Sequence, residues 1–311
     1  MKMQRVALIT GAQGFVGRVL SSYLRQNGWL VRESVMPGQQ EGPNCFACDI
    51  TDLAQVRKLV GRTDGLSHVF HLAAVTFVPA SSIDPAATFE VNVQGTINLV
   101  ESTRALHPRA RFVFVGSAAV YGSPRVSPVN EEHRLAPREP YAISKCAADQ
   151  YCDYVARAHK TEVLRMRPFN HSGAGQSDQF VLSNFARQIA RIERGEIPPV
   201  LEVGNIDAAR DFLHVDDVVR AYEVAALRGR SGEAYNVASG QAVTIRQALE
   251  TLLARSSAKI EVRQDENRMR AVDVSRIEGS YTKLELDTGW RPSIPFETIL
   301  EDLLAYWRQH P

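Results

Sequence analysis

The sequence predicts an α/β protein built on a doubly wound parallel sheet, followed by a smaller C-terminal region. Three observations predict this fold. Short continuous apolar runs alternate with amphipathic stretches through the first half of the chain, a glycine-rich turn follows the first run, and the alternation loosens after Pro168. Continuous apolar strands that alternate with helices are typical of a parallel sheet covered on both faces.

Five runs are predicted as strands because they combine β-branched and aromatic residues with turn residues at their ends. They are "RVALIT" (5–10), "WLVRESV" (29–35), "HVFHLAA" (68–74), "RFVFVGS" (111–117) and "EVLRMRP" (162–168). Apolar residues at helical spacing predict helices between and after these strands. These helices are expected near 15–27, 52–60, 85–106 and 141–159.

The chain after Pro168 has a less regular pattern. A loop, "NHSGAGQSD", leads to a predicted helix near 179–194 and then to Gly and Pro residues at "GEIPP". Two later stretches, 214–227 and 234–239, have the pattern of elements that return to the first domain. We therefore expect one domain at 1–167 and a smaller one at 168–311, with parts of 211–240 belonging to the first.

The composition is that of a globular protein with a sizeable core. The 311 residues are 44% hydrophobic and 23% charged, which excludes disordered and fibrous classes. With 36 Lys and Arg against 35 Asp and Glu the formal net charge is +1, so no overall field attracts nucleic acid or an anionic membrane. We expect a small-molecule ligand whose negative charges are bound by local arginines.

The four cysteines are too few and too clustered to crosslink a chain of this length. Cys45 and Cys48 form one C-x-x-C pair without a second pair, so buried thiols are expected rather than a zinc site. No run approaches ~18 consecutive apolar residues, and the N-terminal stretch reaches a glycine turn before a signal-peptide core could develop. The expectation is a soluble cytoplasmic protein without a metal.

Gly11, Gly14 and Gly17 follow the first predicted strand in "VALITGAQGFVG" and open the first helix. Glycines at this spacing allow a tight turn, a close approach of the backbone to a pyrophosphate, and close helix–strand packing. The helix N-terminus adds free N–H donors for the phosphate charge. Their position among alternating strands and helices predicts a Rossmann dinucleotide site, and a plain turn is the alternative.

The second strand bears on the choice between NAD and NADP. An acid about twenty residues after the glycines would bind the adenosine ribose of NAD. Glu33 is present, although not at the expected end of the strand, and Arg32 lies near enough to bind a 2′-phosphate. This favours NADP(H) and leaves NAD(H) as the alternative. Asp49 could accept a hydrogen bond from adenine or cap the next helix, as Asp52 also could.

Tyr141 and Lys145 lie four residues apart at the start of a predicted helix and share one of its faces. A nearby ammonium stabilises phenolate, which would lower the pKa of the tyrosine from about 10 and make it a proton donor or acceptor. Ser117 ends a predicted strand at the carboxyl edge of the sheet, where open α/β folds bind ligands. With the glycine turn, these three side chains predict a hydride-transfer site, and solvated surface neighbours are the alternative.

These motifs resemble those of the extended short-chain dehydrogenase/reductases, whose sugar-nucleotide members bind the nucleotide in a C-terminal domain. The likeness covers essentially the whole chain and includes "HLAA" (71–74) and "NVQGTINLVES" (92–102). Within the second half, "LEVGNIDAARDFLHVDDVVRAY" (201–222) and "RMRAVDVSRIEGS" (268–280) are similar to the group of GDP-mannose 4,6-dehydratases and GDP-4-keto-6-deoxy-D-mannose reductases, and most of all to the reductases. The resemblance implies a dinucleotide-binding first domain and a sugar-nucleotide-binding second domain.

The motifs and the resemblance together imply three sets of site residues. The catalytic residues are Ser117, Tyr141 and Lys145. The nicotinamide cofactor is expected at Gly11, Gly14, Phe15, Val16, Gly17, Arg32, Asp49, Ile50, Leu72, Ala73, Ala74, Asn92, Tyr141, Lys145 and Pro168. The GDP-sugar is expected at Thr76, Ser117, Ala118, Asn170, Val181, Arg187, Val203, Arg210 and Arg270. A guanidinium suits a diphosphate because it donates two parallel hydrogen bonds, although each arginine could also be solvated or salt-bridged.

The residues after Ser117 separate dehydration from reduction. Elimination of water across C5 and C6 requires a further acid and base, which the dehydratases supply as carboxylates directly after the hydroxyl residue. Here Ala118 and Ala119 follow, and methyl groups transfer no protons, so reduction of a C4 ketone is favoured. In that reaction Tyr141 protonates the C4 oxygen, Ser117 hydrogen-bonds to it, and Lys145 holds the ribose of the nicotinamide. The expected product is GDP-D-rhamnose or its C4 epimer GDP-6-deoxy-D-talose.

Two other functions stay open from the sequence. A nucleotide-sugar 4-epimerase would use the same three residues with a tightly held NAD, and a non-catalytic nucleotide-binding regulator would keep the fold without turnover. The family also implies a homodimer through helices 85–106 and 141–159. Its apolar candidates, which could equally face the chain's own core, are Val91, Ile97, Val100, Cys152 and Val155.

Overall fold

The computed structural model describes residues 4–265 and 274–310, so Arg270, an expected substrate contact, lies outside the described residues. A seven-stranded sheet dominates the fold, with the order β10-β6-β5-β4-β1-β2-β3 and every pairing parallel. Its strands are β1 (Val6–Thr10), β2 (Leu30–Val35), β3 (Cys45–Ala47), β4 (His68–His71), β5 (Arg111–Val115), β6 (Val163–Pro168) and β10 (Ala234–Val237). The predicted doubly wound parallel sheet is confirmed.

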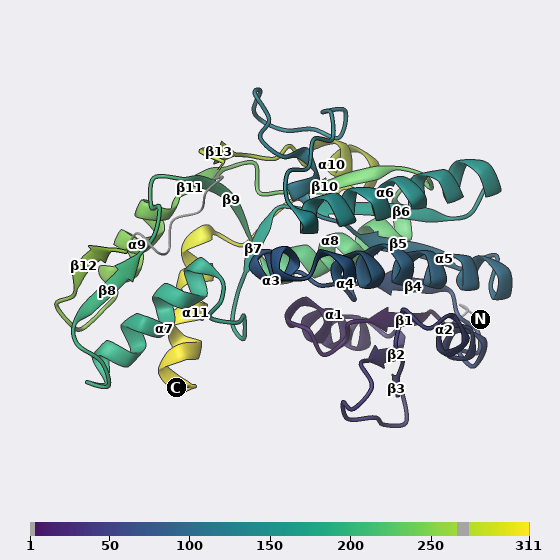
Figure 1. Cartoon of the computed structure of the whole chain (residues 1–311), viewed down its shortest axis with the longest axis horizontal. Helices are drawn as coiled ribbons and strands as arrows, with labels where there is room; N and C mark the ends of the chain where they lie inside the picture. The colour runs from purple at the N-terminus through teal and green to yellow at the C-terminus, as the bar shows by residue number, and fades with distance from the viewer. Residues whose placement is uncertain (1–3, 266–273, 311) are drawn as a thin grey trace.

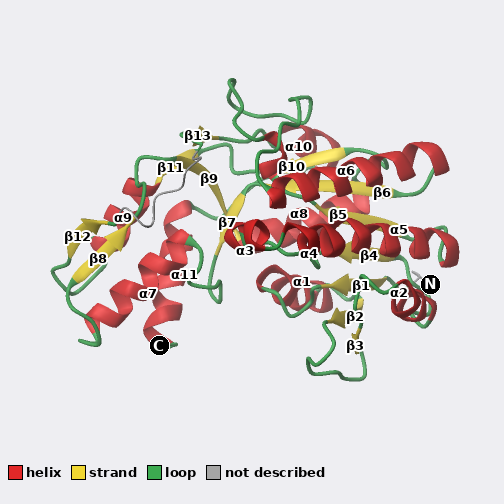
Figure 2. Cartoon of the chain, in the orientation of Figure 1, coloured by secondary structure: helices red, strands yellow, loops and turns green. Residues whose placement is uncertain are grey.

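Helices cover both faces of this sheet (Figures 1 and 2). On one face, α1 (Phe15–Gln26) and α8 (Val215–Arg228) share a hydrophobic cluster with Ala7 and Ile9 of β1. On the other face, α2 (Leu53–Gly61), α5 (Gly95–Leu106) and α6 (Pro140–His159) share a second cluster with Leu8. Alternate residues of β1 therefore point into different clusters, which explains why the strand is apolar from Val6 to Ile9.

The stretch expected as one helix at 85–106 is divided in the structure. It consists of α4 (Pro85–Phe89), a π-helical turn η1 (Glu90–Gln94) and α5. The turn includes Asn92, whose buried side chain accepts a hydrogen bond from Val75 N (2.8 Å) and donates one to Val75 O (3.1 Å). Apolar spacing carries no signal for such a turn, because the residue that occupies it is polar and inward-facing.

A second body, called the smaller body below, surrounds a separate hydrophobic cluster. Its elements are α7 (Val181–Glu193), β8 (Val200–Val203), β9 (Ala209–His214), β11 (Ala242–Thr244), α9 (Ile245–Leu253), β12 (Glu261–Gln264), β13 (Arg276–Ile277) and α11 (Phe296–Gln309). The short strand β7 (Asn170–Ser172) follows β6 and pairs with β9, so it joins the sheet to the smaller body (Figure 1). The helix α10 (Thr282–Thr288) instead contributes Leu284 to the cluster that includes α1 and α8.

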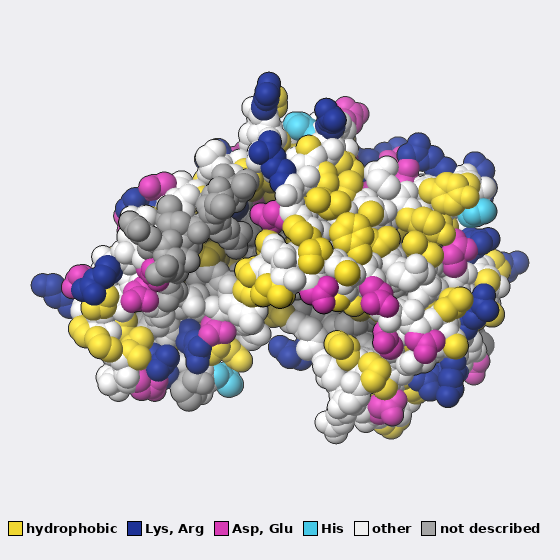
Figure 3. All heavy atoms as spheres, viewed as in Figure 1, with side chains coloured by type: hydrophobic (Ala, Val, Ile, Leu, Met, Phe, Trp, Pro, Cys, Tyr) yellow, Lys and Arg dark blue, Asp and Glu magenta, His cyan; other side chains and the backbone are white. Residues whose placement is uncertain are grey.

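The two helical regions expected to form a dimer interface turn several of the named side chains inward. Val100, Cys152 and Val155 are fully buried in the chain's own second cluster, so for them the alternative of an intramolecular core is correct. The exposed apolar side chains on α4, α5 and α6 are others: Phe89, Leu106, Ile143 and Tyr154. In Figure 3, hydrophobic side chains gather on the face that these helices present.

All four cysteines are free, and Cys48 and Cys152 are buried. Within the described residues, no helix has both the length and the apolar character that crossing a bilayer requires. The remaining described helices are short: α3 (Val78–Ile83) before α4, and the 3-10 turn η2 (Ala118–Tyr121) after β5.

We predict that Gly11→Ala destabilises the fold much more than Gly28→Ala does. Both residues have positive φ, 70° and 79°, so both substitutions incur the left-handed strain of about 1–2 kcal/mol. A Cβ on Gly11 would also lie 2.8 Å from Ala73 N, whereas nothing lies within 4 Å of one on Gly28. The extra overpacking should add about 1–3 kcal/mol, measured as the free energy of urea unfolding without ligand. Equal losses in the two variants would contradict this packing.

Candidate active site

The glycine turn lies at the carboxyl end of β1, directly against the loop after β4. Gly11 approaches the backbone of Ala73 so closely that no side chain fits between them, and Gly14 N donates to Gly11 O (3.0 Å). Gly14 is also the N-cap of α1 and provides no side-chain cap. The N–H groups of the first turn, which includes Phe15, Val16 and Gly17, are therefore available to an anion such as a pyrophosphate.

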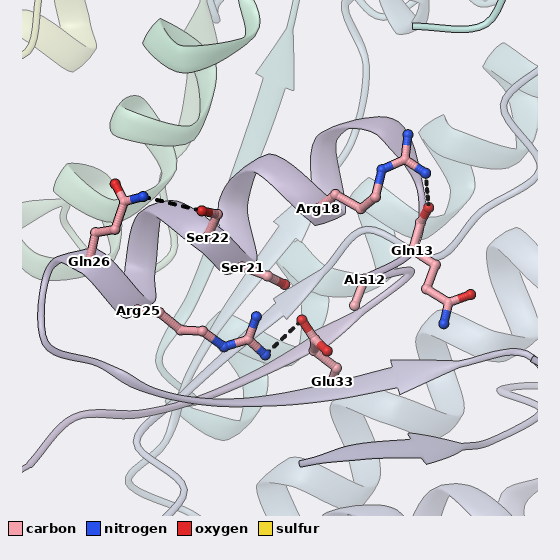
Figure 4. Close-up of a pocket in the computed structure, with 8 residues that line it drawn as sticks. All are labelled: Ala12, Gln13, Arg18, Ser21, Ser22, Arg25, Gln26 and Glu33. Atoms are coloured by element: carbon pink, nitrogen blue, oxygen red, sulfur yellow. Dashed lines mark hydrogen bonds and ion pairs between the residues drawn. The ribbon is translucent and has the colours of Figure 1, made fainter. Parts of the chain in front are cut away.

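The charged residues of β2 point in opposite directions. Glu33 pairs with Arg25 of α1 at 2.8 Å, and Figure 4 shows this pair beneath the helix in a pocket beside Ala12 and Gln13. Arg32 alternates to the other face of the strand and makes no ion pair with any other residue in the described ranges. Glu33, the acid that could have bound a ribose, is thus already in an ion pair. The neighbouring guanidinium of Arg32 has no ion pair within the described ranges.

The segment after β3 is organised by two aspartates with different roles. Asp52 caps α2, accepting hydrogen bonds from Ala54 N (2.8 Å) and Gln55 N (3.1 Å). Asp49 does not cap this helix and instead accepts from the N–H (2.9 Å) and hydroxyl (2.8 Å) of Thr51. Ile50, next to it, is buried in the second cluster. The helix-cap alternative for Asp49 is therefore wrong, and its expected adenine contact stays a prediction.

Asn92 connects the loop after β4 to the catalytic helix. Besides its two bonds to Val75, its amide donates to Ser144 Oγ (2.9 Å), and Ser144 donates to Tyr141 O (2.8 Å). This chain of hydrogen bonds fixes the loop that contains Leu72, Ala73 and Ala74 relative to the first turn of α6. Both N–H groups of the Asn92 amide are used, so a direct contact with a cofactor could form only through the second lone pair of Oδ1.

The three predicted catalytic residues converge. Ser117 follows β5, and Tyr141 occupies the first turn of α6, where its phenol lies close enough to the Ser117 side chain for this hydroxyl to lower the pKa of the tyrosine. Lys145, one turn later, is only 4% exposed and donates from Nζ to Val115 O at 2.7 Å. The end of β5 thus accepts from the lysine and places the serine beside the tyrosine, next to Pro168 at the end of the adjacent β6.

The protonation of this group differs from the expectation. Burial raises the pKa of Tyr141, and the hydrogen bond to Ser117 lowers it by less. Burial also lowers the pKa of Lys145 to about 8. The expected lowering of the tyrosine pKa by Lys145 is therefore wrong for this structure, because the ammonium is bound to Val115 O rather than directed at the phenol. A protonated phenol at neutral pH is suited to donating a proton.

A buried ionic cluster supports the catalytic helix, and the sequence analysis missed it. Asp149 of α6 is fully buried and accepts from Arg165 Nη1 (2.9 Å) and from Arg167 Nε and Nη2 (2.9 Å each), both on β6. Asp149 raises the pKa of the Arg167 guanidinium, against the opposing effect of burial. Arg167 also donates to Tyr121 Oη (3.0 Å). The signal in the sequence was the pair of arginines, Arg165 and Arg167, in the otherwise apolar strand β6.

A cleft of about 120 Å³ lies between the loop after β4 and the smaller body. Thr76, Asn170 and Val181, all expected substrate contacts, line it together with Phe77, His171 and Phe180. None of its described lining residues is a carboxylate. The cleft therefore brings together three predicted residues from three separate elements and offers hydrogen-bonding and apolar groups, and the imidazole of His171 is the one ionisable side chain among its described lining residues.

The other expected substrate contacts lie in different surroundings. Arg187 pairs with Asp178 and stacks over Trp307 (5.4 Å to the ring centroid), and Arg210 Nη1 donates to Ala209 O (2.9 Å) and to Val274 O. Both would have to exchange protein partners for phosphate. The side chains of Val203 and Ala118 are buried in hydrophobic clusters, which leaves only their backbones for a ligand.

We predict that Asp149→Asn lowers the free energy of unfolding by about 3–5 kcal/mol, because it leaves the buried guanidinium of Arg167 without its counter-charge, whereas Arg165 keeps Asp153 at 2.7 Å. Asp207→Asn is the matched control. Asp207 is 77% exposed and pairs with Arg246 at the surface, so its loss should cost about 1 kcal/mol or less. Urea unfolding of both variants measures the difference, and similar small losses would show that the buried cluster does not stabilise the fold.

Comparison with known proteins identifies the family. A model of the GDP-mannose 4,6 dehydratase family matches residues 8–303. The chain is 38% identical to GDP-6-deoxy-D-mannose reductase of Pseudomonas aeruginosa over 98% of both chains, and 28% identical to UDP-glucose 4-epimerase of Streptomyces lividans over 98% of this chain and 96% of that one.

Two solved structures are similar along the whole chain. The structure of RMD from Pseudomonas aeruginosa complexed with NADPH has a TM-score of 0.88 and 36% identity, covering 99% of this chain and 100% of that one. A putative epimerase from Burkholderia cenocepacia has a TM-score of 0.87 and 29% identity, covering 98% of each. The chain therefore belongs to the GDP-mannose 4,6-dehydratase family of extended short-chain dehydrogenase/reductases.

Proposed function

We propose that this protein reduces the C4 ketone of a GDP-4-keto-6-deoxy-hexose with a reduced nicotinamide cofactor. The product is GDP-D-rhamnose or its C4 epimer GDP-6-deoxy-D-talose. The observation that carries the proposal is the convergence of Ser117, Tyr141 and Lys145 beside an uncapped glycine turn at one edge of the sheet. The 38% identity to a GDP-6-deoxy-D-mannose reductase supports the same reaction.

The residues of the site fit a nicotinamide dinucleotide. The close approach of Gly11 to Ala73 and the free N–H groups of α1 form a cradle for a pyrophosphate, and the loop 72–74 flanks it. When bound, the reduced nicotinamide supplies the hydride for the ketone. The protein supplies the rest: binding, orientation and the proton.

The chain's own residues act on the ketone oxygen. Tyr141 holds its proton at neutral pH because burial raises its pKa, and it can transfer that proton to the oxygen as negative charge develops there. Ser117 lies within hydrogen-bonding reach of the same phenol and donates a second hydrogen bond to that oxygen. Lys145, buried and cationic below pH about 8, lies one turn further along the same helix and would hold the ribose of the nicotinamide.

Reduction is favoured over dehydration by what surrounds Ser117. Ala118 is buried in a hydrophobic cluster, and Ala119 donates its backbone N–H to Ser117 Oγ (3.1 Å). Neither residue can remove a proton from C5 or protonate a leaving hydroxyl. The described lining of the cleft adds no carboxylate that could replace them. The site is therefore equipped for one proton transfer, as ketone reduction requires.

The GDP-sugar is assigned to the cleft and to the arginines of the smaller body. Asn170, Thr76 and Val181 line the cleft, while Arg187 and Arg210 come from α7 and β9 at the border of that body. Guanidinium groups that exchange protein acceptors for a diphosphate gain charge-assisted, bidentate hydrogen bonds. We assign Arg270 to the same role from sequence resemblance. On this basis 1–167, together with the parts of 211–240 that pack with the large sheet, is the cofactor domain, and the rest of 168–311 is the sugar-nucleotide domain.

NADP(H) is the favoured cofactor because Arg32 has no ion-pair partner in the described ranges while Glu33 is engaged by Arg25. The NADPH-bound reductase structure at TM-score 0.88 supports the same choice. NAD(H) remains the alternative. A homodimer is assigned to the exposed apolar side chains of α4, α5 and α6, namely Phe89, Leu106 and Ile143.

We predict that Tyr141→Phe lowers the rate of NADPH-dependent ketone reduction by about 10²–10⁴, because it removes the proton donor. Binding of NADPH should persist. The matched control is Tyr306→Phe on α11, outside the site, which should retain the wild-type rate. Steady-state assays with enzymatically made GDP-4-keto-6-deoxy-mannose measure the rate, and calorimetry measures NADPH binding. A fully active Tyr141→Phe variant, or wild-type protein that retains NAD and consumes no added NADPH as an epimerase would, contradicts the proposal.

We predict that Arg32→Ala raises the KM for NADPH about tenfold or more and leaves the KM for NADH nearly unchanged, because a charge-assisted hydrogen bond contributes about 1.5–3 kcal/mol. Arg109→Ala, at an exposed position before β5, is the control for general loss of positive charge. Steady-state kinetics with each cofactor separate the two. Equal increases for NADPH and NADH would show that Arg32 does not bind the 2′-phosphate.

A further inference from the structure

His171 occupies the middle of β7 and lines the cleft beside Asn170 and Phe180. Its strand begins two residues after β6, which ends at Pro168 in the active site, and it pairs in parallel register with Leu213 of β9. The imidazole is therefore presented to the cleft from regular backbone at the junction of the sheet and the smaller body. The motifs that define the active site assign it no role.

Buried polar groups hold the main chain around His171. Gln176 donates from Nε2 to His171 O (2.9 Å) and accepts from Ser172 Oγ. The backbone of Gln176 accepts from Ser183 Oγ (2.7 Å), and Ser183 in turn accepts from Trp307 Nε1 (2.8 Å). None of these bonds uses the imidazole. The framework fixes the position of the ring without occupying its outer nitrogen.

The hydrogen bond inside the ring's own strand determines its tautomer. His171 Nδ1 lies 2.9 Å from Phe169 O, and since a carbonyl oxygen only accepts, Nδ1 must hold the proton. Burial lowers the pKa of His171, so the ring is neutral at pH 7. Nε2 is then an acceptor. Across the described ranges no residue is hydrogen-bonded to it.

The cleft and the catalytic residues therefore offer opposite hydrogen-bonding groups. Tyr141 and Ser117 can donate to a carbonyl oxygen, whereas Nε2 of His171 can only accept. A sugar hydroxyl satisfies an acceptor, but a ketone oxygen placed against it leaves two acceptors facing each other. This difference favours binding of a keto-hexose with its ketone at Tyr141 and Ser117, and it disfavours binding with the ketone at His171.

We propose that Nε2 of His171 accepts a hydrogen bond from the hydroxyl at C2 or C3 of the hexose ring and so directs the C4 ketone to Tyr141. The inference rests on the proposed function for the identity of the sugar. It makes His171 a specificity-determining residue that contacts substrate and takes no part in proton transfer.

Two substitutions separate this contact from a structural role. In His171→Asn, the amide nitrogen can still donate to Phe169 O, but no acceptor remains at the position of Nε2. In His171→Gln, the longer side chain can place its amide oxygen there. We expect kcat/KM for the keto-sugar to fall about tenfold in His171→Asn, the cost of one hydrogen bond, and to recover to within about threefold of wild type in His171→Gln.

Substrates that lack one hydroxyl identify the group that is recognised. Removing the contacted hydroxyl, at C2 or at C3, should cost the wild-type enzyme about tenfold and cost His171→Asn nothing further, since the two changes delete the same bond. His310→Asn is the matched control. His310 also places Nδ1 2.9 Å from a backbone carbonyl, that of Tyr306, but at the exposed end of the chain, and its variant should behave as wild type.

Calorimetric binding of GDP-mannose and of its 2-deoxy and 3-deoxy analogues repeats the comparison without turnover. This binding measurement therefore tests the role of His171 even if the protein reduces no keto-sugar. Absence of reduction would overturn only the proposed function. Wild-type affinity and kcat/KM in His171→Asn would overturn the inference. The inference would also be overturned if the substitution and the missing hydroxyl had independent effects. In that case His171→Asn would still discriminate against both deoxy analogues as strongly as the wild type does.

Discussion

The parallel pairing of the strands is the constraint on which the rest of the structure depends. All pairings in the seven-stranded sheet are parallel, so every strand ends at the same edge. The glycine turn after β1, the loop after β4, Ser117 after β5 and β7 after β6 consequently lie along one line. A cofactor and a substrate placed along that edge meet groups from segments that are more than 150 residues apart.

The position of the catalytic helix depends on contacts with two of those strands. Lys145 binds the last carbonyl of β5, and Asp149, one turn further along α6, binds two arginines of β6. Both contacts are buried, so sliding or rotating α6 would expose or separate charges in a medium of low dielectric. Tyr141 lies in the first turn of the same helix, so these contacts also fix its position relative to Ser117.

Much of the fold could be predicted from the sequence because the sheet is covered on both faces. The predicted strands 5–10 and 162–168 lie within one residue of β1 and β6, because each is dominated by buried apolar residues between turn signals. The short elements could not be predicted in the same way. The strand β3 has only three residues, and β7 lies in a stretch read as a loop, since its pairing with β9 depends on a segment forty residues away.

The same division applies to the site. The glycines, Ser117, Tyr141 and Lys145 could be predicted because each stands at a strand or helix end with a chemically specific neighbour. The pKa of Tyr141 could not, since it depends on burial and on where the lysine ammonium is bound. His171 was missed for a related reason: its role follows from one hydrogen bond to Phe169 O, which has no pattern in the sequence.

Transfer of isotope from cofactor to sugar tests the central claim most directly. The protein is incubated with GDP-4-keto-6-deoxy-mannose and NADPH that carries deuterium on the transferred position of the nicotinamide, and the sugar is then resolved by NMR. The account predicts one deuterium at C4 of a GDP-6-deoxy-hexose and oxidation of one NADPH for each sugar. A product without deuterium at C4, or an epimerised sugar formed without net oxidation of NADPH, would contradict it.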